Sequence, residues 1–389
     1  MQYPVLWLCS WYPSAVDAYH GDFIERQAKA LSTQMPVYVI HVQLVDDDNF
    51  EEGTQHAFTE GGNYTQHIVY VKRSFVKSVS RLTDHVRYIY AMKKAVSRFI
   101  KMYGLPQLVH VHVPIKAGTV GLWMQKKYKL PLIVSEHYGI YNDVAPDKFS
   151  ARHMSFQLRT KNIVAAANEL LVVSNNLGQG IQQYVGVKPF TTVLNVVNEQ
   201  LFYHNTKVQK NEVFTWVHAS TMDYPKNTEG IIRAFVKLHA HNPASQLVLA
   251  GIRTAQVQGL LHQLGNPSYI HYLGMISQAE LALVFQQSHA FVLFSRFENM
   301  PCVVLEALSC GLPVVTTDVG GLPEVINPEN GVLVSSENEQ ELQVAMAKIM
   351  HQYQQFSPEQ ISAQTLASCS FNAIGKQLTH IYAPYLQKT

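Results

Sequence analysis

The sequence predicts an α/β protein built from two doubly wound, Rossmann-like domains. Short apolar strand patterns alternate with helical patterns from the start of the chain, which is typical of parallel sheets covered by helices. The alternation weakens in the polar stretch 198–213, and a second series begins with VFTWVHAS. A length of 389 residues also favours two domains over one. We therefore predict a first domain over 1–200 and a second over 211–369.

The expected strands of the first domain are short apolar runs, and a helix is expected to begin at Asp22. The runs lie at 5–10, 37–42, 68–71, 108–113, 132–135 and 170–174. The opening VLWLCS lacks a basic leader, so we interpret it as the first strand and not as a signal peptide. No apolar stretch is long enough to span a membrane.

In the second domain the most informative segment is FVLFSRFENMPCVVLEALSC, which begins at residue 291. It predicts a buried strand over 291–294 and, behind Pro301, a helix over 302–308. Glu298 then precedes the helix and Glu306 lies inside it, with carboxylates expected roughly 10 Å apart. The helix start between them favours an anion. A nucleotide sugar, whose diphosphate would bridge the two carboxylates, fits this pattern.

The whole block, which continues through GLPVVTTDVGGLPEVI to residue 326, resembles glycosyltransferase family 4. The hallmark of that family is a pair of glutamates separated by seven residues. The resemblance covers nearly the whole chain and implies a retaining nucleotide-sugar enzyme of the glycosyltransferase-B fold. In that fold the two domains face each other across a cleft, and a C-terminal helix crosses back to the first domain. We expect this return helix over 371–386, so that the segment 370–389 completes the first domain.

The resemblance also implies roles for individual residues around the donor substrate. Glu298 and the amides of Asn299 and Met300 would hold the donor sugar, next to Pro301, and Glu306 would bind the ribose. Further residues follow from the family pattern: Gly320, Gly321 and Glu324 in the following loop, and Gly21 in the turn YHGDFIERQ beside the donor phosphates. Catalysis would depend on Glu298, Lys226 and His137.

The family ordinarily presents an arginine and then a lysine to the donor diphosphate. Lys226 matches the lysine, but Ser220 or Thr221 stands where the arginine is expected. A hydroxyl would then take its place, or the charge would come from Arg253 or Arg296.

Three histidines invite a functional interpretation. His137 follows a predicted strand, and the resemblance implies a hydrogen bond from its neutral ring to a sugar hydroxyl. His110 and His112 share one face of a strand, but no third ligand accompanies them, so we expect core histidines and no metal site. The family resemblance likewise implies no metal and no other cofactor.

Charge and cysteine content limit the partners and the compartment. A net charge of +2 gives no reason to expect a nucleic-acid partner, and four cysteines without metal-site spacing favour a reducing cytoplasm. Residues 72–101 carry nine basic residues against one acid, Asp84. This stretch predicts one of two things. It forms either a peripheral contact with the anionic surface at the inner face of the membrane or a solvated helix face.

We therefore predict transfer of a sugar, with retention of configuration, from a nucleotide diphosphate sugar to a hydroxyl of a glycan or lipid-linked acceptor. UDP is the assumed nucleotide, and cell-surface polysaccharide or glycolipid synthesis is the expected setting. Acceptor choice is assigned to the first domain, especially the acidic loop 46–53 and the basic stretch 148–161. Two alternatives remain: a catalytically silent sugar-nucleotide-binding subunit, suggested by the absent arginine, and a sugar-nucleotide epimerase.

Overall fold

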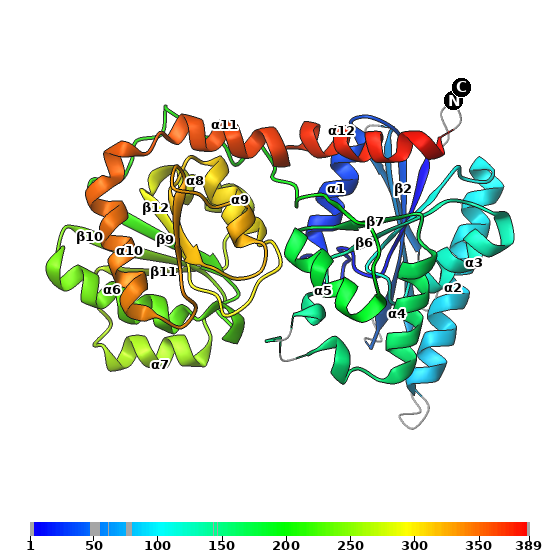
Figure 1. Cartoon of the computed structure of the whole chain (residues 1–389), viewed down its shortest axis with the longest axis horizontal. Coiled ribbons are helices and arrows are strands. Elements are labelled where there is room, and N and C mark those ends of the chain that lie inside the picture. Colours follow the sequence, from blue (N-terminus) through cyan, green and yellow to red (C-terminus); the bar gives the residue numbers. More distant parts are fainter. Residues whose placement is uncertain are drawn as a thin grey trace. The chain divides into compact units, whose positions relative to one another are not determined.

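The computed structural model describes residues 4–46, 55–60, 62–74, 80–142, 144–145 and 147–386. The described residues form two compact units (Figure 1). The first consists of Met1–Val196 and Phe371–Thr389, and the second of Val197–Ser370. Most of the acidic loop 46–53 lies outside the described residues. Residues 75–79, within the basic segment 72–101, also lie outside them.

The first unit contains, among its described residues, an eight-stranded sheet in the order β3-β4-β2-β1-β5-β6-β7-β8. Its pairings are parallel except that β3 runs antiparallel to β4. The strands are β1 (Val5–Cys9), β2 (Val37–Val45), β3 (Gln55–Glu60), β4 (Tyr64–Lys72), β5 (Val109–His112), β6 (Leu132–Glu136), β7 (Glu169–Val172) and β8 (Thr191–Thr192). The helices are α1 (Asp22–Ser32), α2 (Ser80–Tyr103), α3 (Gly118–Tyr128), α4 (Met154–Ala166), α5 (Asn175–Val185) and α12 (Phe371–Tyr382).

The central strand β1 is buried along its whole length, as expected for a strand covered by helices on both faces. Its Trp7 belongs to a core cluster that also includes Leu31 of α1 and Leu378 of α12. Helix α12 contacts α1. The segment predicted as a return helix therefore belongs to the core of the first unit.

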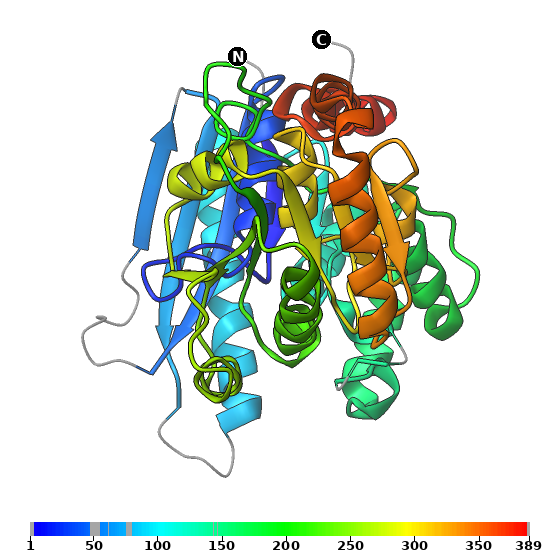
Figure 2. The same ribbon diagram turned by 90° about the vertical axis from the view of Figure 1, so that its left-hand side faces the viewer.

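The second unit contains, in its described part, a parallel six-stranded sheet in the order β11-β10-β9-β12-β13-β14. The strands are β9 (Phe214–Ser220), β10 (Ser245–Gly251), β11 (Ile270–Gly274), β12 (Ala290–Leu293), β13 (Val314–Thr317) and β14 (Gly331–Val334). The helices are α6 (Thr228–His241), α7 (Ala255–Gln263), α8 (Gln278–Gln287), α9 (Cys302–Ser309), α10 (Glu339–Gln352) and α11 (Pro358–Cys369). Helices α6 and α10 contact each other (Figure 2), and α9 contacts α11.

Two features differ from the sequence-based expectations. The polar stretch 198–213 lies inside the second unit, which begins at Val197. Strands β3 and β8 were not predicted, because their sequences, QHAFTE and TT, have no apolar run. They form the two edges of the first sheet by pairing with β4 and β7.

Candidate active site

Lys226 and Glu298 come together at the carboxyl edge of the second sheet. Lys226 ends a short 3-10 helix, η3 (Tyr224–Lys226), that follows β9, and Glu298 follows the neighbouring strand β12. The Nζ atom of Lys226 lies 2.6 Å from Oε1 of Glu298, and the Ser295 hydroxyl donates to the same oxygen at 2.7 Å. Glu298 is buried and Lys226 is partly exposed. Ligands bind at this edge in open α/β sheets.

The loop that carries Glu298 is held by the loop that follows β13. A Cβ atom on Gly320 would lie 1.9 Å from the carbonyl oxygen of Glu298, and Gly320 has a positive φ of 60°. The amide of Gly321 donates to the carbonyl oxygen of Asn299 at 2.7 Å. Gly320 therefore permits a close backbone approach that shapes the turn around Glu298.

Helix α9 begins behind Pro301, as predicted, and no side chain caps its start. Met300 is buried next to this start, and Glu306 is buried in the middle of the helix. The donor-binding roles of Asn299, Met300, Pro301 and Glu306 stay predictions. The separation expected between the carboxylates of Glu298 and Glu306 also stays a prediction.

The hydroxyl of Ser220 is already bound within its own turn. It lies 2.7 Å from Nε2 of His218 and accepts from the amide of Met222 at 2.9 Å. Burial lowers the pKa of His218 to about 4, so the ring is neutral at physiological pH. Thr221 is exposed. A diphosphate contact by either hydroxyl stays a prediction.

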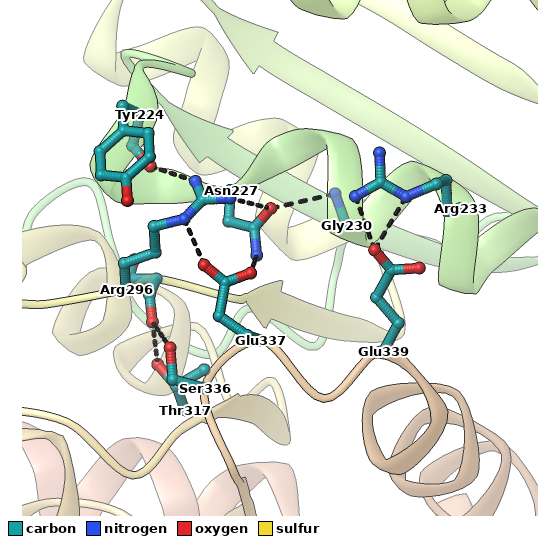
Figure 3. A network of polar contacts seen from close by, with 10 residues as sticks. Tyr224, Asn227, Gly230, Arg233, Arg296, Thr317, Ser336, Glu337 and Glu339 are labelled. Atoms are coloured by element: carbon teal, nitrogen blue, oxygen red, sulfur yellow. Dashed lines mark hydrogen bonds and ion pairs between the residues drawn. The ribbon is translucent and has the colours of Figure 1, made fainter.

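Arg296 forms a polar network that the sequence did not predict (Figure 3). Its Nε atom lies 2.5 Å from Oε1 of Glu337, and its Nη2 donates to Oδ1 of Asn227 at 3.1 Å. Its Nη1 donates to the carbonyl oxygen of Tyr224. Three guanidinium nitrogens are therefore engaged by protein acceptors. No short motif connects these residues, which follow strands β9, β12 and β14.

The other cation considered for the diphosphate, Arg253, lies against an aromatic ring. Its guanidinium carbon is 4.0 Å from the centroid of the Tyr272 ring, and its side chain is exposed. This stacking holds the head group by a cation–π contact.

His137, in the first unit, follows β6 and is buried. Its Nε2 lies 3.4 Å from Nδ1 of His112, and its ring packs against Phe23 with centroids 4.9 Å apart. Burial lowers the pKa of His137 to about 3. The ring is therefore neutral near pH 7, which the predicted sugar contact requires.

The neighbouring Glu136 is buried and hydrogen-bonded. Its Oε1 accepts from the amides of His137 and Tyr138 at 2.8 and 2.9 Å, and its Oε2 accepts from the hydroxyl of Tyr141 at 2.9 Å. Burial raises the pKa of Glu136 to about 7. The carboxyl group thus fixes the segment that directly follows β6.

His110 and His112 are fully buried core residues. His110 lies 2.5 Å from the hydroxyl of Tyr382 through Nδ1 and 2.8 Å from the hydroxyl of Ser135 through Nε2. Among the described residues, no group of three or more His, Cys, Asp or Glu side chains is arranged to hold a metal ion.

Gly21 precedes α1 in a left-handed conformation with φ 81°. A Cβ atom there would lie 2.8 Å from the carbonyl carbon of Trp11 and 2.9 Å from the amide nitrogen of Tyr12. The close approach of the chain's own backbone therefore explains this glycine. Its role beside the donor phosphates stays a prediction.

Two family models match consecutive parts of the chain. The model described as "Glycosyltransferase Family 4" matches residues 23–201, and the model described as "Glycosyl transferases group 1" matches residues 200–364. The chain belongs to glycosyltransferase family 4. The family prediction is thus confirmed, and the chain is a glycosyltransferase of group 1.

Known proteins similar to this family 4 chain include a putative teichuronic acid biosynthesis glycosyltransferase, TuaC, from Bacillus subtilis. It is 22% identical over 374 residues, which cover 91% of each chain. The chain spans about half the length of several other curated relatives that it matches, between 44% and 60%.

Solved structures of other proteins share the fold of this family 4 chain. A sucrose-phosphate synthase from Thermosynechococcus elongatus has a TM-score of 0.79 and 18% identity, with 98% of each chain covered. Anabaena HepE in complex with UDP has a TM-score of 0.73 and 15% identity, and covers 98% of this chain and 100% of its own. The prediction of two Rossmann-like domains with the glycosyltransferase-B fold is confirmed. Of the residues described, no helix is both long and apolar enough to cross a membrane.

Proposed function

We propose that this family 4 enzyme transfers a glycosyl group from a nucleotide diphosphate sugar to a hydroxyl group of a glycan or lipid-linked acceptor. The configuration at the anomeric carbon would be retained, and no metal ion would be required. The observation that carries this proposal is the contact between Lys226 and Glu298, 2.6 Å apart at the carboxyl edge of the second sheet. One cation and one carboxylate suit a diphosphate and a sugar hydroxyl respectively.

In the proposed reaction the bond between the anomeric carbon and the diphosphate breaks while the acceptor oxygen bonds to that carbon on the same face. The acceptor proton passes to an oxygen of the leaving diphosphate. Lys226, released from Glu298 by the substrate, would stabilise the charge that develops on this leaving group, and the start of α9 would assist. Glu298 would then hold a hydroxyl of the donor sugar.

His137 would hydrogen-bond to the transferred sugar. Its pKa of about 3 keeps the imidazole neutral, so that the ring can donate from one nitrogen and accept at the other. A neutral ring also avoids repulsion of the positive charge that develops at the anomeric carbon.

We propose UDP as the nucleotide of the donor, because HepE, which shares the fold, has been solved in complex with UDP and with UDP-glucose. The acceptor would belong to a cell-surface polymer or its lipid-linked precursor. TuaC, a relative over 91% of its length, is putatively assigned to teichuronic acid biosynthesis.

We also propose that helix α2 lies on an anionic membrane surface. Leu82, Val86 and Tyr90 recur at four-residue spacing and are 67%, 58% and 70% exposed, so they share one face of the helix. Lys94 and Lys101 are exposed on the same helix. Apolar side chains beside lysines match the chemistry of an anionic lipid surface.

A thermal-shift screen of UDP, ADP and GDP, each alone and as a nucleotide sugar, tests the proposal. We expect a diphosphate to raise the melting temperature of the wild-type chain, because a ligand bound only by the folded state stabilises it. Release of nucleotide on incubation with the matching sugar donor separates an active enzyme from a silent binding subunit. NMR of the product gives the anomeric configuration. Activity after EDTA treatment tests whether a metal ion is required. A product of inverted configuration contradicts the proposed stereochemistry.

A further inference from the structure

Arg296 lies two residues before Glu298 and binds the η3 turn that carries Lys226. Its backbone amide donates to the carbonyl oxygen of Pro225 at 2.8 Å, and its side chain donates to the carbonyl oxygen of Tyr224. The guanidinium carbon also lies 4.3 Å from the centroid of the Tyr224 ring. The turn is thus held by hydrogen bonds and by a cation–π contact.

Asn227, the residue directly after η3, connects this turn to the next helix. Its Oδ1 accepts from Nη2 of Arg296 at 3.1 Å and from the amide of Gly230 at 3.3 Å. The second of these bonds caps the start of α6. The side chain of Asn227 therefore fixes the position of η3 against a helix.

Glu337 completes a closed ring of contacts (Figure 3). Its Oε1 lies 2.5 Å from Nε of Arg296, and its Oε2 accepts from Nδ2 of Asn227 at 3.4 Å. The neighbouring pair of Arg233 and Glu339 is a separate contact, 2.6 Å long, that does not reach η3.

The backbone around this ring adopts conformations that non-glycine residues usually avoid. Met222, Asn227 and Glu337 have positive φ values of 52°, 46° and 64°. They are three of the six such residues in the described part of the chain. Strained backbone of this kind persists where the surroundings fix it, and it is concentrated at functional sites.

We propose that Arg296 is a positioning residue, oriented by Glu337, that fixes the η3 turn and thereby places Lys226 for contact with the donor diphosphate. This inference rests on the proposed function. Arg296 acts through the turn, because three of its nitrogens already donate to Glu337, Tyr224 and Asn227. Lys226 contributes the charge that meets the substrate, and Arg296 determines where that charge lies.

A double-mutant cycle on diphosphate binding tests this dependence. The probe is UDP, or whichever of UDP, ADP and GDP binds the wild-type chain most tightly, and calorimetry measures its Kd. We expect Lys226→Ala and Arg296→Gln each to raise the Kd roughly 10- to 100-fold, as expected for loss or misplacement of one charge-assisted contact. The double variant should match Lys226→Ala within about twofold, because its two changes remove the same interaction.

Two further variants make the cycle decisive. Glu337→Gln should weaken binding in the same direction as Arg296→Gln and should add little to it in the combined variant. The matched control is Arg233→Gln, which breaks an ion pair of the same unit away from η3 and should leave the Kd unchanged within about twofold. Melting temperatures of all variants report any general loss of stability.

The outcomes separate the inference from the proposed function. If Arg296→Gln and Lys226→Ala weaken binding by factors that multiply, Arg296 acts independently of Lys226 and the positioning role is wrong. If Arg296→Gln changes only the melting temperature, the network is structural and the inference also fails. If no diphosphate binds the wild-type chain, or if Lys226→Ala binds as wild type does, the proposed function fails first and the positioning role fails with it.

Discussion

The ammonium group of Lys226 and the carboxylate of Glu298 are in contact although the two residues are 72 positions apart. Each is the partner of the other, with Glu298 8% and Lys226 22% exposed at the side chain. In the proposed function a donor diphosphate would replace the carboxylate as the partner of Lys226. Recognition of the leaving group and recognition of the sugar would then be linked through this pair.

Replacing Lys226 is expected to remove most of the stabilisation of the leaving group. We expect Lys226→Ala to lower turnover of the nucleotide sugar by about 100-fold or more, as for loss of one charge-stabilising donor. The matched control is Lys348→Ala, a change at an exposed lysine of α10. The rate of nucleotide release measures the turnover of both variants. Turnover by Lys226→Ala at the wild-type rate would contradict the role of this lysine.

Gly320→Ala is expected to disturb the site without removing any functional group. The new Cβ would lie 1.9 Å from the carbonyl oxygen of Glu298, at a φ of 60°, so the Glu298 turn must move. We expect weaker diphosphate binding and a loss of about 1–3 kcal/mol in unfolding free energy. Gly259→Ala is the control, because a Cβ there meets nothing within 4 Å. Its position inside α7 predicts a small gain in stability.

The raised pKa of Glu136 predicts a pH-dependent contribution to stability. Burial raises it from 4.5 to about 7, so the folded chain binds this proton more tightly than the unfolded chain does. The contribution is fully present below pH 4.5 and is lost as the pH rises through about 7. We expect the unfolding free energy of wild type, minus that of Glu136→Gln, to fall by about 3 kcal/mol from pH 4 to pH 8. Urea denaturation measures it, and a flat or rising difference would show the expectation to be wrong.

Tyr382→Phe tests the contact between the return helix and the first sheet. The hydroxyl of Tyr382 lies 2.5 Å from Nδ1 of His110, and both residues are fully buried. Removing it leaves a buried ring nitrogen without that partner, so we expect a loss of about 1–3 kcal/mol in unfolding free energy. Tyr90→Phe, at a side chain that is 70% exposed, should change it by less than about 0.5 kcal/mol. Equal losses for the two variants would contradict this account.

Co-sedimentation with vesicles tests the proposed lipid contact of α2. We expect the chain to bind vesicles that contain phosphatidylglycerol and to dissociate from them at high salt. It should not bind vesicles of pure phosphatidylcholine. The double variant Lys94→Gln, Lys101→Gln should lower partitioning roughly 30-fold, since each lysine near an anionic surface contributes about 1 kcal/mol. Lys348→Gln in the second unit is the control. Wild-type binding to neither vesicle would remove the proposal.

Much of the fold was predictable because the deciding signals are local. Apolar runs bounded by polar residues predicted β1, β6 and β12, and Pro301 predicted the start of α9. The strand β3 was missed because pairing with β4, and not its own composition, forms it. Edge strands tolerate polar sequences of this kind.

Sequence patterns could not predict the network around Arg296, for a different reason. Glu337 is 41 positions from Arg296, and Asn227 is 69 positions away on the other side. These residues meet only because the sheet brings the loops after β9, β12 and β14 to one edge. The left-handed conformation of Glu337 has no sequence signature, since glycine and asparagine are the residues that usually mark it.

The order of synthesis gives the two units different folding histories. The second unit is one uninterrupted segment, whereas the first needs α12, which leaves the ribosome only after the whole second unit has been made. Until then the nascent first unit lacks Ile374 and Leu378, which complete its core, and it presents the surface of α1 that they will cover. A chaperone that shields this surface during translation would protect the protein while this apolar surface is exposed.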